Sequence, residues 1–280
     1  MPTDFIRAFQ RNRGAVFGVV VLGLMLLLAI FADLLFPTSP WDMTAAPFTP
    51  PFDASAWLGT DTLGRDIASG IAHGARVSLL VGVVATAVAV TVGVLLGAIA
   101  GYHGGRIDSA IVHFTELFQT IPNFVLVVVT VAIFTPSLFS IVGAIALVSW
   151  PPLARLVRGE FLSLREREFV QAAITSGQST TTIILRQILP NSLSPIIVSA
   201  SLMVATSILL ESSLSFLGLG DPNAMTWGFM IGSARTVLRQ AWWMSFFPGV
   251  AILLTVLALN LIGEGLNDAF NPRLRRGRRT

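Results

Sequence analysis

Residues 165–190 read REREFVQAAITSGQSTTTIILRQILP and are the most informative interval of the chain. It is polar, but it lies between two apolar runs that are each long enough to cross a bilayer. A helix of charged and small residues, held at a membrane surface between two spans, is suited to docking on a soluble partner. The sequence therefore predicts a surface helix near 164–177 that contacts a protein outside the membrane.

The composition indicates a membrane protein. The chain has 280 residues, of which 54% are hydrophobic and only 12% are charged; its mean hydropathy is +0.77. Soluble domains carry about a quarter charged residues, so this chain has too few charges to cover a soluble surface. All 18 basic residues are arginine. The absence of cysteine excludes disulfides, thiolate metal sites and cysteine nucleophiles.

Six apolar runs reach the length of about 20 residues that a spanning helix needs. They lie near 15–36, 78–101, 113–134, 138–158, 191–211 and 243–263. The first run follows three arginines and has no cleavage site after it, which predicts an uncleaved anchor. We expect an all-α membrane protein in three parts: an anchor span with a proline-rich external loop (1–76), a five-span core (77–265) and a basic tail (266–280).

The arginines predict the orientation. With six spans, 14 of the 18 arginines fall on the side of the two termini, and only Arg65, Arg76, Arg235 and Arg239 fall on the other. Because arginine accumulates in cytoplasmic loops, the termini and the 159–190 interval are expected in the cytoplasm. The loops 37–76 and 212–242 are then external. They serve either to dock an external partner or as spacers packed on the rim.

Local signals set the ends of the surface helix. Ser163 and Glu166 have the spacing of a capping box, which predicts that the helix begins there. Phe169, Ala172 and Ala173 are then expected on one face, where two alanines let another backbone approach closely.

Two further signals set how the interval ends. Gly177 is suited to the left-handed conformation that ends a helix. A second short helix at about 180–189 would return the chain to the membrane, and Pro190 would break it there.

The same interval resembles the cytoplasmic motif of ABC-importer permeases. That motif reads Glu-Ala-Ala, three residues, Gly, nine residues, Ile, one residue, Leu-Pro. Ala172, Ala173 and Gly177 match it, as do Leu189 and Pro190, whereas glutamine replaces the expected residue at 171 and 187. The departure at Gln171 removes a carboxylate but keeps a hydrogen-bonding side chain. Segments 57–61, 64–66, 74–82, 214–220, 227–228 and 260–268 are similar to the dipeptide, oligopeptide and nickel branch of these permeases.

The resemblance implies the type I ABC-importer permease fold and a non-catalytic subunit. Its partners would be a homologous second permease, two cytoplasmic ATPases that bind ATP and Mg, and an extracytoplasmic binding protein that delivers di- or oligopeptides. Nickel, glutathione or another small solute are alternative cargoes. The chain has no lysine and therefore no phosphate-binding loop of its own. The residues implied in ATPase coupling are Phe169, Val170, Gln171, Ala172, Ala173 and Gly177.

The spans carry packing and passage signals. Gly93, Gly97 and Gly101 recur every four residues, which predicts close packing of the second span on another helix. In the fifth span Ser192, Ser199, Thr206 and Ser213 recur every seven residues, either as a polar route or as small packing residues. Glu116, Asn123 and Glu211 are further passage candidates, because polar groups inside spans are costly and usually functional. Glu211 would either bind a substrate amine, contact an arginine of the partner subunit or form a structural salt bridge.

Other chemistries fit less well. Residues 218–221 spell the G-x-G-D of intramembrane aspartyl proteases, but a second aspartate after a tyrosine is missing. His113 and Glu116 share a helix face, yet a metal site needs more ligands. A secondary transporter or channel is the rival class, although no internal repeat is evident.

Overall fold

The computed structural model describes residue 6 and residues 9–270. Within these residues the regular structure is helical, with isolated bridges but no strand. Five helices are long and apolar enough to cross a membrane. They are α2 (Arg13–Ile30), α4 (Ile67–His103), α7 (Leu138–Arg165), the continuous helix Thr180–Phe216 and α12 (Trp243–Phe270). The basic residues after 270 lie outside the described part of the chain.

The third span is broken, which corrects the single helix predicted at 113–134. Helix α5 (Gly105–Gln119) and helix α6 (Asn123–Phe134) meet at an angle of 80°. Pro122 supplies the physical reason, because its ring disfavours the α conformation of the preceding residue and it has no N–H to donate. The helix also begins earlier than predicted, since its polar first turns pack against α7. Counted as one span, the bent pair completes six.

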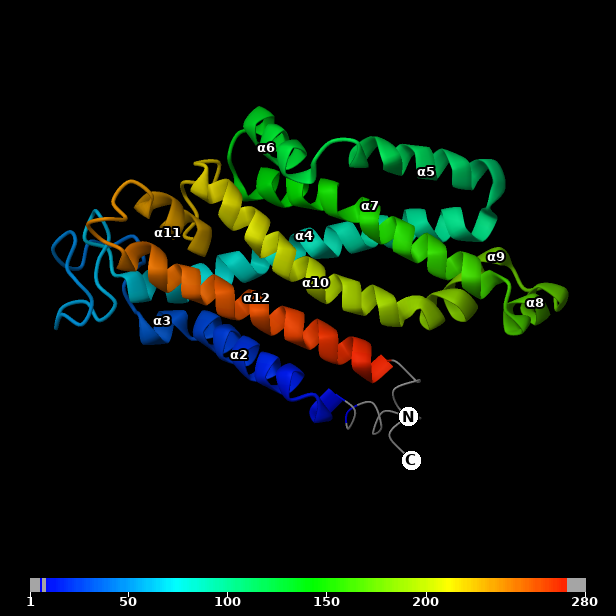
Figure 1. The fold of residues 1–280 in the computed structure, drawn as a ribbon, viewed down its shortest axis with the longest axis horizontal. Coiled ribbons are helices and arrows are strands. Elements are labelled where there is room, and N and C mark those ends of the chain that lie inside the picture. Colours follow the sequence, from blue (N-terminus) through cyan, green and yellow to red (C-terminus); the bar gives the residue numbers. More distant parts are fainter. Residues whose placement is uncertain (1–5, 7–8, 271–280) are drawn as a thin grey trace.

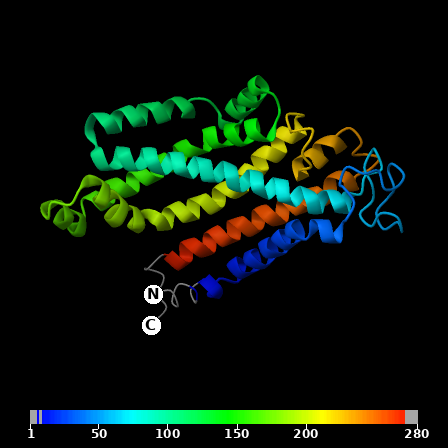
Figure 2. The same cartoon turned by 180° about the vertical axis from the view of Figure 1, so that it is seen from behind.

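The six crossings alternate in direction (Figure 1). Helix α2 begins and α12 ends at the same end of the bundle as α8 (Glu168–Thr175), the short helix that follows α7. The long helix α4 packs against α7 along much of its length and also contacts the helix α10 (Leu189–Phe216). Figure 2 shows α2 beside α12 at the opposite edge from α5.

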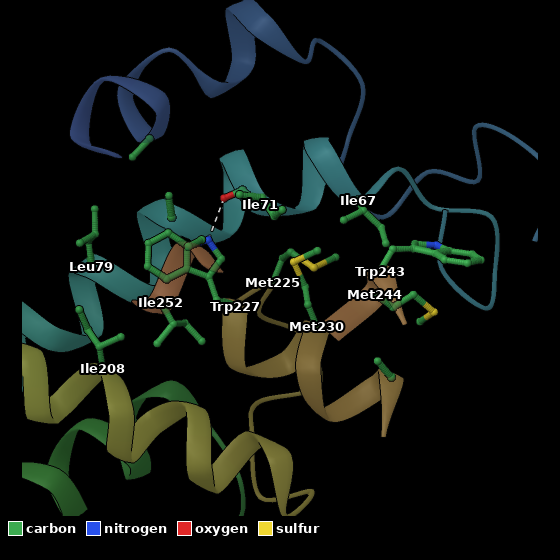
Figure 3. Close-up of a cluster of buried hydrophobic side chains, with 14 of the residues drawn as sticks. Ile67, Ile71, Leu79, Ile208, Met225, Trp227, Met230, Trp243, Met244 and Ile252 are labelled. Carbon is green, nitrogen blue, oxygen red and sulfur yellow. Dashed lines mark hydrogen bonds between the residues drawn. The ribbon is translucent and has the colours of Figure 1, made fainter. Parts of the chain in front are cut away.

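The end away from α8 is closed by residues 36–66 and by α11 (Trp227–Ala234), a short helix that packs against α10, α12 and α4. Trp227 is fully buried there (Figure 3). Its indole Nε1 donates to the Ile71 carbonyl at 3.0 Å, and its backbone N–H donates to the Ser78 hydroxyl at 3.0 Å. These bonds satisfy both donors of Trp227 and fix α11 on α4.

The external loop predicted for 37–76 ends at residue 66. Asp66 is the N-cap of α4 and accepts a hydrogen bond from the Ala68 N–H at 3.0 Å. Burial raises the pKa of the Asp66 carboxyl, against the lowering effect of the backbone donors at Ala68 and Ser69. The expected boundary between 76 and 77 therefore falls inside α4.

Pro190 does not break the helix in which it lies, contrary to the prediction. The chain runs from α9 (Thr180–Thr182) through the π-helical segment η1 (Ile183–Ile188) into α10, where Pro190 occupies the first turn. Proline lacks an N–H and its ring collides with the carbonyl four residues before it. The wider π turn just before Pro190 accommodates that defect, and the helix continues.

Candidate functional site

Helix α8 is the surface helix expected in the 165–190 interval, but its start differs from the prediction. Ser163 lies inside α7, which continues to Arg165, and α8 begins at Glu168 after Arg167, which makes no side-chain capping bond. The predicted helix start at the capping box of Ser163 and Glu166 is wrong. The reason is that Phe161, buried on α7, packs in one cluster with Val170 of α8. That packing keeps α7 helical past the local start signal.

Helix α8 ends at a left-handed residue, Gly177, as the sequence predicts. Gly177 has φ +73°. The Gly177 N–H donates to the Ile174 carbonyl at 3.0 Å, and the Gln178 N–H donates to the Ala173 carbonyl at 3.1 Å. This pair of bonds is a Schellman motif, which needs a left-handed residue after the helix. The turn gives α8 a fixed length of eight residues.

The two alanines of α8 do not share an outward face, which corrects the predicted surface. Val170 and Ala173 are buried and pack with residues of α7 and η1. Phe169 and Ala172 point outward, and Phe169 is 42% exposed. One face of α8 is therefore held against this chain, while the opposite face presents an exposed phenyl ring beside an exposed alanine.

Gln171 makes a bond that a glutamate could not make. Its side-chain Nε2 donates to the Arg165 carbonyl at 3.0 Å, at the end of α7. A carboxylate has no hydrogen to give, so the amide braces the turn between α7 and α8. The departure from the resembled motif thus has a local structural role.

The glycines of α4 lie against α7. A Cβ at Gly97 would stand 2.5 Å from the Ala154 carbonyl oxygen, and one at Gly101 would stand 2.6 Å from the Phe161 Cβ. A Cβ at Gly93 would meet the Trp150 carbonyl oxygen at 3.0 Å. The two helices approach so closely that no side chain fits between them at these positions. Because α7 leads directly to α8, the close packing of α4 on α7 helps to fix the position of α8 relative to the bundle.

Glu211 is buried in a group of hydroxyls, not in a salt bridge. It is 1% exposed. Its Oε1 accepts from Ser215 Oγ and Thr226 Oγ1, both at 2.8 Å, and its Oε2 accepts from Ser212 Oγ at 3.4 Å. It makes no ion pair with the described residues. The predicted structural salt bridge was wrong, since hydroxyls from α10 and from the N-cap of α11 supply all its bonds.

Replacing Glu211 by leucine should loosen α11, whereas glutamine should be tolerated. Leucine removes the acceptor of the Ser215 and Thr226 hydroxyls, and each unpaired buried hydroxyl costs about 1–3 kcal/mol. Glutamine keeps that acceptor and can donate to Ser212. Thermal unfolding and tryptic cleavage at Arg235, which follows α11, would measure the difference. Equal stability and equal cleavage of the two variants would contradict this role for Glu211.

The hydroxyl series of α10 does not form one continuous exposed stripe. Ser192 is buried and Ser199 is partly buried, whereas Thr206 and Ser213 are exposed. The hydroxyls of Thr206 and Ser213 bond to carbonyls of their own helix at 3.0 and 2.8 Å. Exposed apolar residues lie on the same face, namely Leu202, Leu209 and Phe216.

Glu116 and Asn123 are both exposed, on the two sides of the break between α5 and α6. Helix α5 is fixed to α7 by a bidentate ion pair, in which Arg158 Nη2 lies 2.7 Å from Asp108 Oδ2 and Arg158 Nε bonds the other oxygen. Sequence reasoning missed the polar residues of α5 before 113, because the third span was expected to begin there. Within the described residues no group of His, Cys, Asp or Glu could hold a metal ion.

The chain matches two protein families. Residues 93–276 match the family of binding-protein-dependent transport system inner membrane components, and residues 3–51 match the N-terminal TM domain of oligopeptide transport permease C. Among solved structures, an inward-facing MetNI methionine ABC transporter has the same fold, with a TM-score of 0.58 and 16% identity over 70% of this chain and 93% of that one. This likeness confirms the fold class predicted from the sequence.

Curated relatives match along nearly the whole chain. A dipeptide transport system permease protein of Alkalihalophilus pseudofirmus is 42% identical over 97% of this chain and 90% of its own length. An oligopeptide transport system permease protein of Escherichia coli is 40% identical, over 96% and 90% respectively. A di/tripeptide transport system permease protein of Pseudomonas aeruginosa is 38% identical, over 97% and 92%. The chain therefore belongs to the family of binding-protein-dependent transport system inner membrane components, as a multi-pass inner-membrane permease.

Proposed function

We propose that this chain is a permease subunit of an ATP-driven importer of di- or oligopeptides and forms half of the translocation passage. The observation that carries the proposal is the exposed face of α8. A short rigid helix at one end of a spanning bundle presents Phe169 and Ala172 outward, in a chain that has no phosphate-binding loop. Relatives named as peptide permeases, matched over nearly the whole chain, support the substrate class.

The ATPases bind at α8 on the cytoplasmic side. Most arginines in the described part of the chain lie toward the end of the bundle where α8 lies, including Arg106, Arg155, Arg158, Arg165 and Arg186. Among these described residues only Arg65, Arg76, Arg235 and Arg239 lie toward the opposite end. This bias supports a cytoplasmic position of α8 and of both termini. Because Val170 and Ala173 hold α8 against α7 and η1, closure of an ATPase pair would move α8 together with two spanning helices.

The binding protein docks at the opposite end. Residues 36–66 pack on the bundle there, with Trp243 Nε1 donating to the Thr60 carbonyl at 3.1 Å. Large apolar side chains of this segment face outward, including Phe52 and Trp57, which are 76% and 70% exposed. Aromatic residues exposed on a fixed surface are typical of protein interfaces.

A second, homologous permease covers the exposed face of α10. Leu202, Thr206, Leu209, Ser213 and Phe216 follow one another at spacings of four and three residues, which is the pattern of a helix packing seam. Small and apolar residues at these positions allow close approach in lipid. Ser199, Thr206 and Ser213 stay candidates for the passage wall where that seam opens, as do Glu116 and Asn123. Glu211 is sealed from any such wall in this conformation.

Uptake by the reconstituted complex tests the proposal. The chain would be placed in vesicles with its second permease, its ATPases and its binding protein, and labelled di- and tripeptides would be offered. The expected result is peptide accumulation that needs both ATP and the binding protein. Accumulation of nickel or another solute, with no peptide uptake, would contradict the substrate class. Uptake on an ion gradient without ATP would contradict the transporter class.

A further inference from the structure

One face of α5 is polar along the length of the helix and is turned away from the rest of this chain. Its residues follow one another at spacings of three and four, so they form one stripe. All of them are exposed. The stripe consists of Arg106, Ser109, His113, Glu116 and Thr120.

The opposite side of α5 packs on this chain. Thr115 is buried, and Asp108 is held by Arg158 of α7. These contacts fix the rotation of α5 about its axis. The outward direction of the stripe is therefore a property of the fold and does not depend on how the exposed side chains rotate.

The charged members of the stripe have no counter-charge within the described residues. Neither Arg106 nor Glu116 makes an ion pair or a side-chain hydrogen bond there. The Nδ1 of His113 lies 2.6 Å from the Ser109 carbonyl oxygen. Because a carbonyl only accepts, the His113 Nδ1 is the donor in this contact.

The stripe runs along one half of a candidate membrane span. Helix α5 is the half of the broken span nearer to α8, and its 15 residues cover about 22 Å. Glu116 lies close to the break, inside that candidate span, where an exposed carboxylate is too costly to face lipid tails. It faces either water or a complementary polar partner.

The break beyond the stripe leaves backbone donors open. The first N–H groups of α6, at Asn123, Phe124 and Val125, have no intrahelical acceptor, and Pro122 at the cap position makes no side-chain bond to them. All three residues are exposed. Backbone donors left open in a membrane occur where the chain borders a water-filled cavity or is covered by another protein.

We propose that the stripe is the wall of the aqueous passage on the α8 side of the break, and that Glu116 holds the cationic amino group of the passing peptide. The inference rests on the proposed function. A zwitterionic solute in water satisfies a stripe that carries Arg106, Glu116 and hydroxyls together. A contact with the second permease would instead require a matched buried partner for each of Arg106, His113 and Glu116, along the whole helix.

Cysteine scanning of the reconstituted importer tests the wall. The chain has no cysteine, so single thiols can be placed without background from it. Cysteine at each stripe position should react with a membrane-impermeant maleimide. Two controls should stay unreactive: Thr115→Cys, which is buried, and Ile107→Cys, which is 47% exposed on the side away from the stripe. Unreactive stripe thiols in a complex that still imports peptide would mean that the second permease covers them and would overturn the inference. Equal reaction at Ile107→Cys would also overturn it.

Glu116 variants test the contact with the amino group. With the binding protein and the peptide unchanged, Glu116→Gln should lower the uptake rate about ten-fold, because a charge-assisted hydrogen bond is lost. Glu116→Asp should restore most of the rate. Ile107→Val, on the side of α5 away from the stripe, should leave the rate near that of the wild type. Excess peptide should slow the labelling of Glu116→Cys. Equal rates for Glu116→Gln and wild type would overturn this contact. Failure of the wild-type complex to import any peptide would refute the proposed function instead.

Discussion

Replacing Gly97 by leucine is expected to separate α4 from α7 and to abolish a stable bundle. Even a single Cβ at this position would lie 2.5 Å from the Ala154 carbonyl oxygen and 2.8 Å from the Val157 Cβ. Neither atom is the flexible end of a long side chain, so the helices themselves must move apart. Overpacking of this kind costs about 3 kcal/mol or more. The measurement is the thermal unfolding midpoint of the purified chain in detergent.

Gly143 provides the matched control for this substitution. It lies on α7, and a Cβ there would meet nothing within 4 Å. Gly143→Leu is therefore expected to change the free energy of unfolding by less than about 0.5 kcal/mol. Gly97→Ala should fall between the two leucine variants. Similar unfolding midpoints for Gly97→Leu and Gly143→Leu would mean that the close contact between α4 and α7 does not hold the bundle together.

Replacing Ala172 by tryptophan is expected to uncouple ATP hydrolysis from peptide uptake without unfolding the chain. Ala172 points outward from α8 beside Phe169, so an indole ring there would fill the space that a docked ATPase needs. Overpacking an interface costs about 2 kcal/mol, which lowers uptake by about ten-fold or more. The rate of ATP hydrolysis, the rate of ATP-dependent uptake and the unfolding midpoint should be measured on the same preparation.

Two further variants separate coupling from folding. Ala173→Trp should lower the unfolding midpoint, because Ala173 is buried against α7 and η1. Thr181→Trp lies at an exposed site outside α8 and should leave both uptake and stability unchanged. A normal uptake rate in Ala172→Trp would rule out the outward face of α8 as the docking surface.

Hydropathy alone was enough to predict the main architecture. Apolar runs of spanning length identified five of the helices, because a bilayer demands that length and composition. The third span was located less well. Its first turns are polar, and they are helical because Asp108 finds Arg158 on α7, a contact between residues 50 positions apart. No window of local hydropathy contains that information.

The surface helix shows where local signals succeed and fail. Gly177 indicated the end of α8 correctly, because a left-handed residue is required by the turn itself. Ser163 and Glu166 misplaced its start, because packing of Phe161 and Val170 decides where α7 stops. The rotation of α8, which buries Ala173 and exposes Ala172, is set by the same tertiary contacts. The hydroxyl partners of Glu211 come from α10 and from the N-cap of α11. Residue spacing along the sequence does not predict them, because the packing of α11 on α10 brings Thr226 to Glu211.

Crosslinking from α8 tests most directly whether separate ATPases drive this chain. A photoreactive maleimide would be attached to Phe169→Cys in the otherwise cysteine-free chain and irradiated in the assembled complex. We predict a crosslink to an ATPase subunit from Phe169→Cys, and none from Trp57→Cys, which is exposed at the opposite end of the bundle. A crosslink from Trp57→Cys to an ATPase would contradict the claim that separate ATPases drive this chain from α8. The absence of a crosslink from Phe169→Cys, in a complex that imports peptide, would contradict it as well.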